Sequence, residues 1–396
     1  MSPRQRAFVG TGGAVLLVIT AGQMIVPRIL QTNYHALIAS GEGVVEESLQ
    51  PLPVMHLAPP ESLKALYMTA CVAATPSWRR ELKALVEKTE LNAIVIDIKD
   101  YTGTISFPHN LEKSGSQRGC VVPDLSDFIR ELHQAGIYVI GRISVFQDLS
   151  YSTLHPELAV QSKSTGGIWK DRKGISFIDV GATPYWEYIV QIGHASYELG
   201  FDELNFDYIR YPSDGNMDDV QYNWMVGTST KPEMLESFFV YLKQQLKDSG
   251  AVLSADLFGM TTTVTSDMGI GQILEKALPH FDYVAPMVYP SHYPSGWNGL
   301  NNPAEHPYDV IKIAMSEGRR REELFNLSRG VATSTPSKLR PWLQDFNLGA
   351  TYGVDKVQAQ MKATYDSGLS SWMLWSAANR YTEAALLSDR VLQVEQ

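Results

Sequence analysis

The chain has 396 residues, 44% hydrophobic and 19% charged, a composition typical of a globular protein with a sizeable core. Its 33 Lys and Arg against 43 Asp and Glu give a net charge of −10 without a long basic run, which argues against a nucleic-acid partner. The two cysteines exclude a disulfide-dense scaffold and any metal site built from four thiolates.

Residues 1–30 have the pattern of a membrane anchor. Arg4 and Arg6 precede an uncharged run over residues 7–27, which as a helix would span about 31 Å and match a bilayer core. Because basic residues favour the cytoplasmic side, we expect a single-pass protein of the cell membrane with its folded domain outside the cytoplasm. A cleaved signal peptide is the alternative, since residues 20–22 are small, and it predicts a secreted protein.

Residues 31–65 are expected to form a linker, because glutamates and prolines alternate there and prolines disfavour helices and central strands. From residue 66 onward, strand-like and helix-like segments alternate. Strands are expected at 66–73, 92–99, 137–146, 203–211, 251–258, 281–289, 339–346 and 370–375. Helices are expected at 77–88, with Ser77 as N-cap, and at 124–135, 184–199, 231–247, 271–278, 307–325, 355–366 and 383–394.

Eight strand-then-helix units predict an α/β fold, a (β/α)8 TIM barrel over residues 66–396. An open doubly wound sheet is the alternative. The dinucleotide-binding pattern Gly-x-Gly-x-x-Gly does not follow the first expected strand, which favours the barrel.

Catalytic groups of a TIM barrel lie at the C-terminal ends of its strands, so polar residues there are the candidates. Alternation along the strands places isoleucines, leucines and phenylalanines toward the helices. The opposite, inward face then carries Asp97 and Lys99 on the second strand, Asn205 and Asp207 on the fourth, and Asp256 on the fifth.

Buried carboxylates need partners or a function. In the simpler interpretation, basic residues only neutralise them: Lys99 would pair with Asp97 on the same strand face, and Arg142 or Arg210 with the others. The strand pattern leaves the direction of the Arg142 side chain open. In the functional interpretation, these acids form a catalytic site.

Aromatic side chains follow the later strands. The segment 289–297 carries Tyr289, His292 and Trp297, and the seventh and eighth strands carry Trp342 and Trp375. Rings beside carboxylates suit sugars, which stack their C–H faces and offer hydroxyls to acids. One tryptophan of the eighth strand is expected to belong to the core instead.

Other kinds of site find little support in the sequence. It has no His-x-His, His-Glu-x-x-His or Gly-x-Ser-x-Gly pattern, and residues 214–218 lack the Gly and Glu of a calcium loop. We therefore expect no metal and no cofactor. Cys71 and Cys120 could form a disulfide, which the sequence leaves open.

Four segments carry a family resemblance: VIDIKD at 95–100, NFDYIRYP at 205–212, DYVAPMVYP at 282–290 and RPWLQDF at 340–346. They resemble a bacterial family of glycoside-hydrolase-like (β/α)8 barrels whose function is not defined, over roughly residues 64–393. More distantly, the chain is similar to the α-amylase superfamily. That resemblance implies a nucleophile at Asp207, an acid at Asp256 and a candidate third acid at Asp345. Asn205 stands where that superfamily has Arg, and Asp256 where it usually has Glu.

We therefore expect a glycoside hydrolase that acts on an extracytoplasmic oligo- or polysaccharide through Asp207 and Asp256. The expected sugar-binding residues are Asp97, Lys99, Arg142, Asn205, Tyr208, Arg210, Tyr289, His292, Trp297, Trp342 and Trp375. Two alternatives remain: a carbohydrate-binding barrel without catalysis, and a structural protein of the cell envelope.

Overall fold

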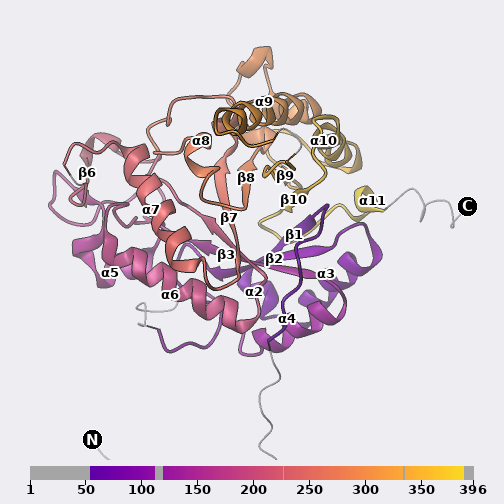
Figure 1. The fold of residues 1–396 in the computed structure, drawn as a ribbon, viewed down its shortest axis with the longest axis horizontal. Helices are drawn as coiled ribbons and strands as arrows, with labels where there is room; N and C mark the ends of the chain where they lie inside the picture. Colours follow the sequence, from indigo (N-terminus) through magenta and orange to yellow (C-terminus); the bar gives the residue numbers. More distant parts are fainter. Residues whose placement is uncertain (1–53, 112–118, 226, 333–334, 388–396) are drawn as a thin grey trace, which may run out of the picture. The chain divides into compact units, whose positions relative to one another are not determined.

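Eight parallel strands close into a barrel (Figure 1), which confirms the predicted TIM barrel. Around the barrel the order is β1, β2, β3, β5, β7, β8, β9 and β10, and β10 pairs with β1. The strands are β1 Lys64–Met68, β2 Ala93–Lys99, β3 Tyr138–Ser144, β5 Glu203–Asp207, β7 Val252–Phe258, β8 Tyr283–Met287, β9 Trp342–Gln344 and β10 Trp372–Trp375.

The computed structural model describes residues 54–111, 119–225, 227–332 and 335–387. The predicted anchor at 1–30 and the predicted linker up to residue 53 lie outside these ranges. Among the helices within them, none has the length and apolar character needed to span a bilayer.

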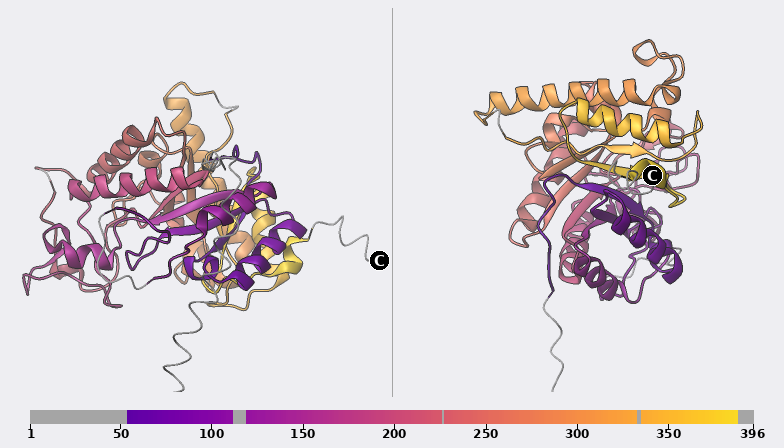
Figure 2. Two further views of the ribbon diagram at one scale, coloured as in Figure 1. Left: turned by 90° about the horizontal axis from the view of Figure 1, so that it is seen from below. Right: turned by 90° about the vertical axis from the view of Figure 1, so that its right-hand side faces the viewer.

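Helices surround the ring of strands, as the views in Figures 1 and 2 show. The α-helices are α2 Ala70–Ala73, α3 Pro76–Lys88, α4 Leu125–Gln134, α5 Leu149–Leu154, α6 Thr183–Leu199, α7 Lys231–Leu246, α8 Leu274–Ala277, α9 Pro307–Ser328, α10 Val354–Asp366 and α11 Glu383–Leu386. Short 3-10 turns lie at Pro156–Leu158, Met217–Asp219, Gly259–Thr262, Pro290–His292, Trp297–Gly299 and Pro303–Glu305.

Several predicted boundaries were wrong for local reasons. The first strand ends at Met68, because Thr69 caps the short helix α2 by accepting a hydrogen bond from the Val72 backbone N–H. Helix α3 begins at Pro76, so Thr75 and not Ser77 occupies its N-cap position. The last helix ends at Leu386 in the described residues, and its predicted continuation to residue 394 lies mostly outside them.

The predicted alternation along the strands is confirmed by two separate apolar clusters. The larger lies between the strands and the helices and contains the expected outward residues, among them Ile94, Ile96, Leu204 and Phe206. The smaller fills the barrel interior and includes Tyr67, Val95, Tyr138, Ala285 and Trp342. The interior also holds a buried ion pair between Arg340 and Glu203, to which the Tyr138 hydroxyl donates.

Additional structure lies outside the barrel. The strands β4 (Gln161–Ser162) and β6 (Val220–Gln221) form an antiparallel pair with its own small apolar cluster. A disulfide joins Cys71 of α2 to Cys120 in the segment between β2 and α4. Residues 54–63, at the end of the predicted linker, belong to the folded unit: Leu63 is buried, and the Leu57 N–H donates to Asp202.

Candidate active site

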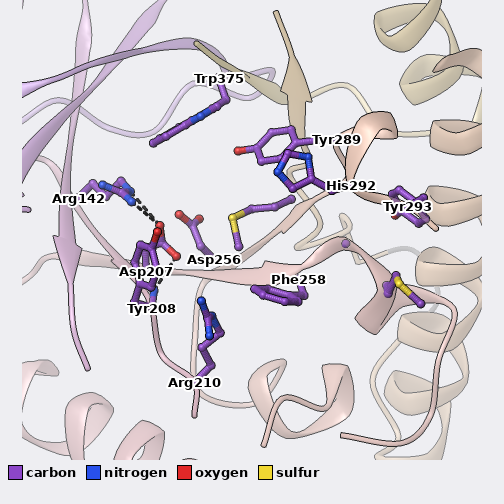
Figure 3. Close-up of a pocket in the computed structure, with 13 residues that line it drawn as sticks. Arg142, Asp207, Tyr208, Arg210, Asp256, Phe258, Tyr289, His292, Tyr293 and Trp375 are labelled. Carbon is purple, nitrogen blue, oxygen red and sulfur yellow. Dashed lines mark hydrogen bonds and ion pairs between the residues drawn. The ribbon is translucent and has the colours of Figure 1, made fainter. Parts of the chain in front are cut away.

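A cavity of about 360 Å³ opens at the C-terminal ends of the strands (Figure 3). Carboxyl groups enter it from β5 and β7, a guanidinium enters from β3, and aromatic rings enter from several loops and from β10. Its lining residues are Arg142, Asp207, Tyr208, Arg210, Asp256, Phe258, Gly259, Met260, Met287, Tyr289, His292, Tyr293 and Trp375.

Arg142 connects two acids from different strands. Its Nη1 donates to Asp97 Oδ1 at 2.7 Å, and its Nε and Nη2 both donate to Asp207 Oδ2, the former at 3.0 Å. Burial opposes the charge on Arg142, but Asp207 and Asp97 outweigh it and raise its pKa, so the guanidinium is charged. Trp375 supports it from one side, with the guanidinium carbon 5.1 Å from the ring centre.

The expected pairing of Lys99 with Asp97 was wrong. Lys99 Nζ lies 2.7 Å from Asp148 Oδ2 and donates to the Ser144 carbonyl at 2.6 Å, and its side chain is fully buried. Asp97 instead accepts from Arg142 and, at 2.5 Å, from the hydroxyl of Tyr67. Neither Lys99 nor Asp97 lines the cavity, so both lie behind the surface that a ligand would contact.

Asp256 has a very different environment from Asp207. Its Oδ1 accepts hydrogen bonds from Asn205 Nδ2 at 2.9 Å and Trp342 Nε1 at 2.8 Å, and no described basic residue forms an ion pair with it. Burial and the nearby charge of Asp207 raise the pKa of Asp256 well above its usual range. The cavity therefore combines an acid bound to a guanidinium with an acid whose surroundings favour its protonated form.

The backbone turns sharply where β5 ends. Tyr208 has φ +52°, in the left-handed region that side-chain-bearing residues rarely adopt, and such conformations concentrate at functional sites. Its N–H donates to Asp207 Oδ1 at 2.6 Å. The expected strand continuation to Tyr211 was wrong for this reason, and the turn directs Asp207 and Tyr208 into the same cavity.

Of the six expected aromatic and histidine sugar contacts, four line the cavity: Tyr208, Tyr289, His292 and Trp375. Trp342 is fully buried inside the barrel, donates to the Asp256 carboxyl group and packs edge-on against Trp375 at a ring-centre distance of 5.7 Å, so it does not line the cavity itself. Trp297 lies outside the cavity lining, where it is half-buried and packs on Tyr293 at a ring-centre distance of 4.5 Å. On β10, Trp372 is the core residue and Trp375 faces the cavity.

The structure places two other candidates away from the cavity surface. Asp345 accepts hydrogen bonds from the backbone N–H and the hydroxyl of Thr382, both at 2.7 Å, and it does not line the cavity. It therefore supplies no third acid there. Asn205 is fully buried and bridges Ser254 and Asp256, so it holds the carboxyl group and does not line the cavity itself.

Some residues of the site were missed by the sequence analysis. Tyr67 on β1 and Met287 on β8 follow the same inward alternation as the acids, so that pattern could have identified them. Phe258 ends β7, and Tyr293 lies inside the aromatic segment that the sequence did single out. Across the described ranges, no group of three or more His, Cys, Asp or Glu is arranged to hold a metal ion.

Comparisons with solved structures support the barrel fold. The glycoside hydrolase domain of PgaB (BpsB) from Bordetella bronchiseptica is similar with a TM-score of 0.60 at 15% identity, over 83% of this chain and 98% of that one. An alpha-L-fucosidase isoenzyme from Paenibacillus thiaminolyticus is similar with a TM-score of 0.53 at 10% identity, over 84% of this chain and 48% of that one. At these identities the likeness shows the fold alone.

Sequence comparisons assign the family. A hypothetical protein from Ruminiclostridium thermocellum is 33% identical over 48% of this chain and 96% of its own, with a TM-score of 0.44. No curated protein shows significant similarity to the chain. The model of a family described as "Putative glycosyl hydrolase domain" matches residues 65–381, which include every strand of the barrel except the first residue of β1. The chain therefore belongs to this glycosyl hydrolase domain family, as its resemblance in sequence implied.

Proposed function

We propose that this chain hydrolyses glycosidic bonds, with Asp256 as the general acid and Asp207 as the nucleophile or general base. The observation that carries the proposal is the contrast between the two carboxyl groups of one cavity. Asp207 accepts two hydrogen bonds from a guanidinium, whereas Asp256 is buried beside that carboxylate, which raises its pKa. Pairs of carboxyl groups with opposed environments are typical of glycosidases.

The chemistry follows from these environments. Oδ1 of Asp256 accepts from Asn205 and Trp342, so the proton resides on the other oxygen. That proton passes to the leaving-group oxygen as the glycosidic bond breaks, and Asp256 becomes a carboxylate. Asp207 acts in one of two ways: it takes a proton from the water that attacks the sugar carbon, or it bonds to that carbon itself. In the second case, water then attacks the same carbon, the bond to Asp207 breaks, and Asp256 takes the proton that the water loses. Its negative charge stabilises the positive charge that develops on the sugar ring.

The aromatic rings of the cavity would hold the sugar. Trp375 stacks on Tyr67 at a ring-centre distance of 4.0 Å, and Tyr289 packs edge-on against His292 at 5.3 Å. Because these rings support one another, they keep fixed positions around the two carboxyl groups (Figure 3). A sugar ring stacked on them would have its hydroxyls within reach of the acids.

We also place the barrel outside the cytoplasm, on a membrane anchor formed by residues 1–30. The disulfide between Cys71 and Cys120 supports this location, because such bonds persist in oxidising compartments. Alkaline carbonate extraction of membranes from cells expressing the full chain should leave it in the pellet. A soluble product that begins near residue 22 would contradict the anchor and establish cleavage instead.

The catalytic proposal is tested with Asp207→Asn. The full-length chain is screened for release of reducing ends from a panel of glycans, and the active substrate is used for both proteins. Asn keeps an oxygen that can accept from Arg142, so the variant should fold and bind, yet turnover should fall by orders of magnitude. Asp309→Asn, on the exposed surface of α9, is the matched control and should leave turnover unchanged.

Equal turnover for wild type and Asp207→Asn would refute the assignment. Glycan binding without hydrolysis by the wild type would instead favour a carbohydrate-binding barrel that lacks catalysis. Neither outcome depends on knowing the linkage in advance, because the comparison uses the same glycan for each protein.

A further inference from the structure

Arg210 stands apart from the other charged residues of the cavity. Its side chain enters from the loop after β5 and points toward the carboxyl groups (Figure 3). Arg142, Lys99 and Arg340 each form an ion pair with a buried acid, but within the described ranges Arg210 forms none. The cavity therefore contains a cation that forms no ion pair with a described residue, although the charges of Asp207, Asp171 and Asp214 act on it from a greater distance.

The guanidinium is nevertheless held in place. Nη1 donates to the Tyr211 carbonyl at 3.0 Å and to Ser213 Oγ at 3.3 Å. Aromatic rings lie on its sides, with the guanidinium carbon 4.8 Å from the ring centre of Phe258 and 5.2 Å from that of Tyr208. A group fixed in this way loses little conformational freedom when a ligand binds to it.

The remaining donors form one edge of the guanidinium. No described residue accepts a hydrogen bond from Nε or Nη2 of Arg210, and neither atom is among the buried polar atoms that lack a partner. These two atoms are therefore not fully enclosed by the protein, and Arg210 is one of the residues that line the cavity. The Nε and Nη2 edge presents two parallel N–H groups, which match the two oxygens of a carboxylate.

The charges around Arg210 also favour a negatively charged ligand. Burial lowers the pKa of Arg210, and Tyr208, Asp207, Asp171 and Asp214 compensate only in part. A half-buried cation is costly unless it is paired, and Asp207 already has its hydrogen bonds from Arg142. The missing partner is therefore expected to arrive with the ligand.

We propose that Arg210 binds a carboxylate on the substrate, so that the preferred glycan contains a uronic acid beside the bond that is cleaved. The assignment of the ligand as a glycan rests on the proposed function, whereas the assignment of its negative charge rests on Arg210 alone. An anionic substituent would otherwise be repelled by Asp207, which explains why a cation stands next to the acids.

Matched pairs of probes test this proposal. Trisaccharides of galacturonic, glucuronic and mannuronic acid are compared with their carboxyl-reduced counterparts, in which CH2OH replaces each carboxylate. Binding is measured by calorimetry with full-length Asp207→Asn, which should not cleave them. At least one acidic probe should bind about tenfold or more tighter than its reduced counterpart.

Substitutions of Arg210 on the same background then identify the contact. Arg210→Gln should weaken binding of the acidic probe about tenfold or more and leave the reduced probe within about twofold. Arg210→Lys keeps the charge but not the two parallel donors, so its loss should be smaller. Arg172→Gln, whose side chain is 78% exposed, is the control and should change neither. If Arg210→Gln does not fold, the same comparison is made with Arg210→Lys, which should weaken binding of the acidic probe and leave that of the reduced probe unchanged.

The proposal is overturned if no acidic probe binds better than its reduced counterpart, or if Arg210→Gln weakens both probes equally. Failure of the proposed function looks different. In that case the acidic probe binds through Arg210, but neither it nor any other glycan is hydrolysed in a manner that depends on Asp207. Conversely, Asp207-dependent hydrolysis of a neutral glycan, together with acidic probes that bind no better than their reduced counterparts, would retain the proposed function and refute the carboxylate site.

Discussion

Trp342→Phe is the substitution that tests most directly how the protein sets the protonation of Asp256. The Trp342 Nε1–H donates to Asp256 Oδ1 at 2.8 Å from inside the barrel, where the ring is fully buried. Burial and Asp207 raise the pKa of Asp256, whereas the hydrogen bonds from Asn205 and Trp342 lower it. Removing the indole donor therefore raises this pKa further, and Asp256 stays protonated to higher pH.

The size of the effect follows from the strength of one hydrogen bond. A hydrogen bond to a charged group contributes about 1.5–3 kcal/mol. The protonated carboxyl group also accepts from the indole, so only about half of that energy distinguishes the two protonation states. Because 1.36 kcal/mol corresponds to one pH unit, the basic limb of the activity profile should move upward by about 1 pH unit.

The assay is kcat/KM against pH on the glycan that the wild type hydrolyses, since this profile reports the free enzyme. Carbon-13 NMR titration of labelled aspartates, with Asp256→Asn identifying the signal, gives the same answer without a substrate. Trp372→Phe is the control, because the Trp372 indole is equally buried but donates to the Tyr365 hydroxyl. An unchanged basic limb, or one displaced to lower pH, would refute the reasoning.

Three further predictions concern stability and binding. Arg142→Gln should lower the free energy of unfolding in urea by about 3–5 kcal/mol at pH 7.5, because two carboxylates lose their buried partner, and by less at lower pH, because burial raises the pKa of Asp97 and this acid takes up a proton as the pH falls. Cys71→Ser should cost about 2–4 kcal/mol in the same assay under oxidising conditions, with no difference from wild type under reduction. Trp375→Ala should weaken glycan binding by about 1–3 kcal/mol in calorimetry, whereas Trp297→Ala, outside the cavity lining, should leave it unchanged.

The barrel and its inward acids could be predicted because both depend on local patterns. Alternation along each strand determines which side chains face the interior, and it correctly placed Asp97, Asp207 and Asp256 there. The ion pairs could not be predicted in this way, because they join different strands. The register between β2 and β3 shifts between Asp97 and Lys99, which separates these neighbours and lets each reach a different partner.

Loop positions were predicted less well for a related reason. The aromatic segment after β8 was expected to place Trp297 beside the acids, but its Gly and Pro residues let the chain fold back, and Trp297 packs on Tyr293 instead. The early end of β5 could not be predicted either. The strand ends at Asp207 because Tyr208 adopts a positive φ, a conformation that the residue type does not indicate.

The charges at the C-terminal end of the barrel link the binding of an acidic glycan to the protonation of the general acid Asp256. Arg142 forms the ion pairs of both Asp97 and Asp207, so a deprotonated Asp256 would add a negative charge that has no ion-pair partner among the described residues. A substrate carboxylate bound to Arg210 adds one negative charge near Asp256, and like charges favour the protonated form of a carboxyl group. Binding of such a substrate would therefore raise the pKa of Asp256 and keep the proton that the leaving group needs.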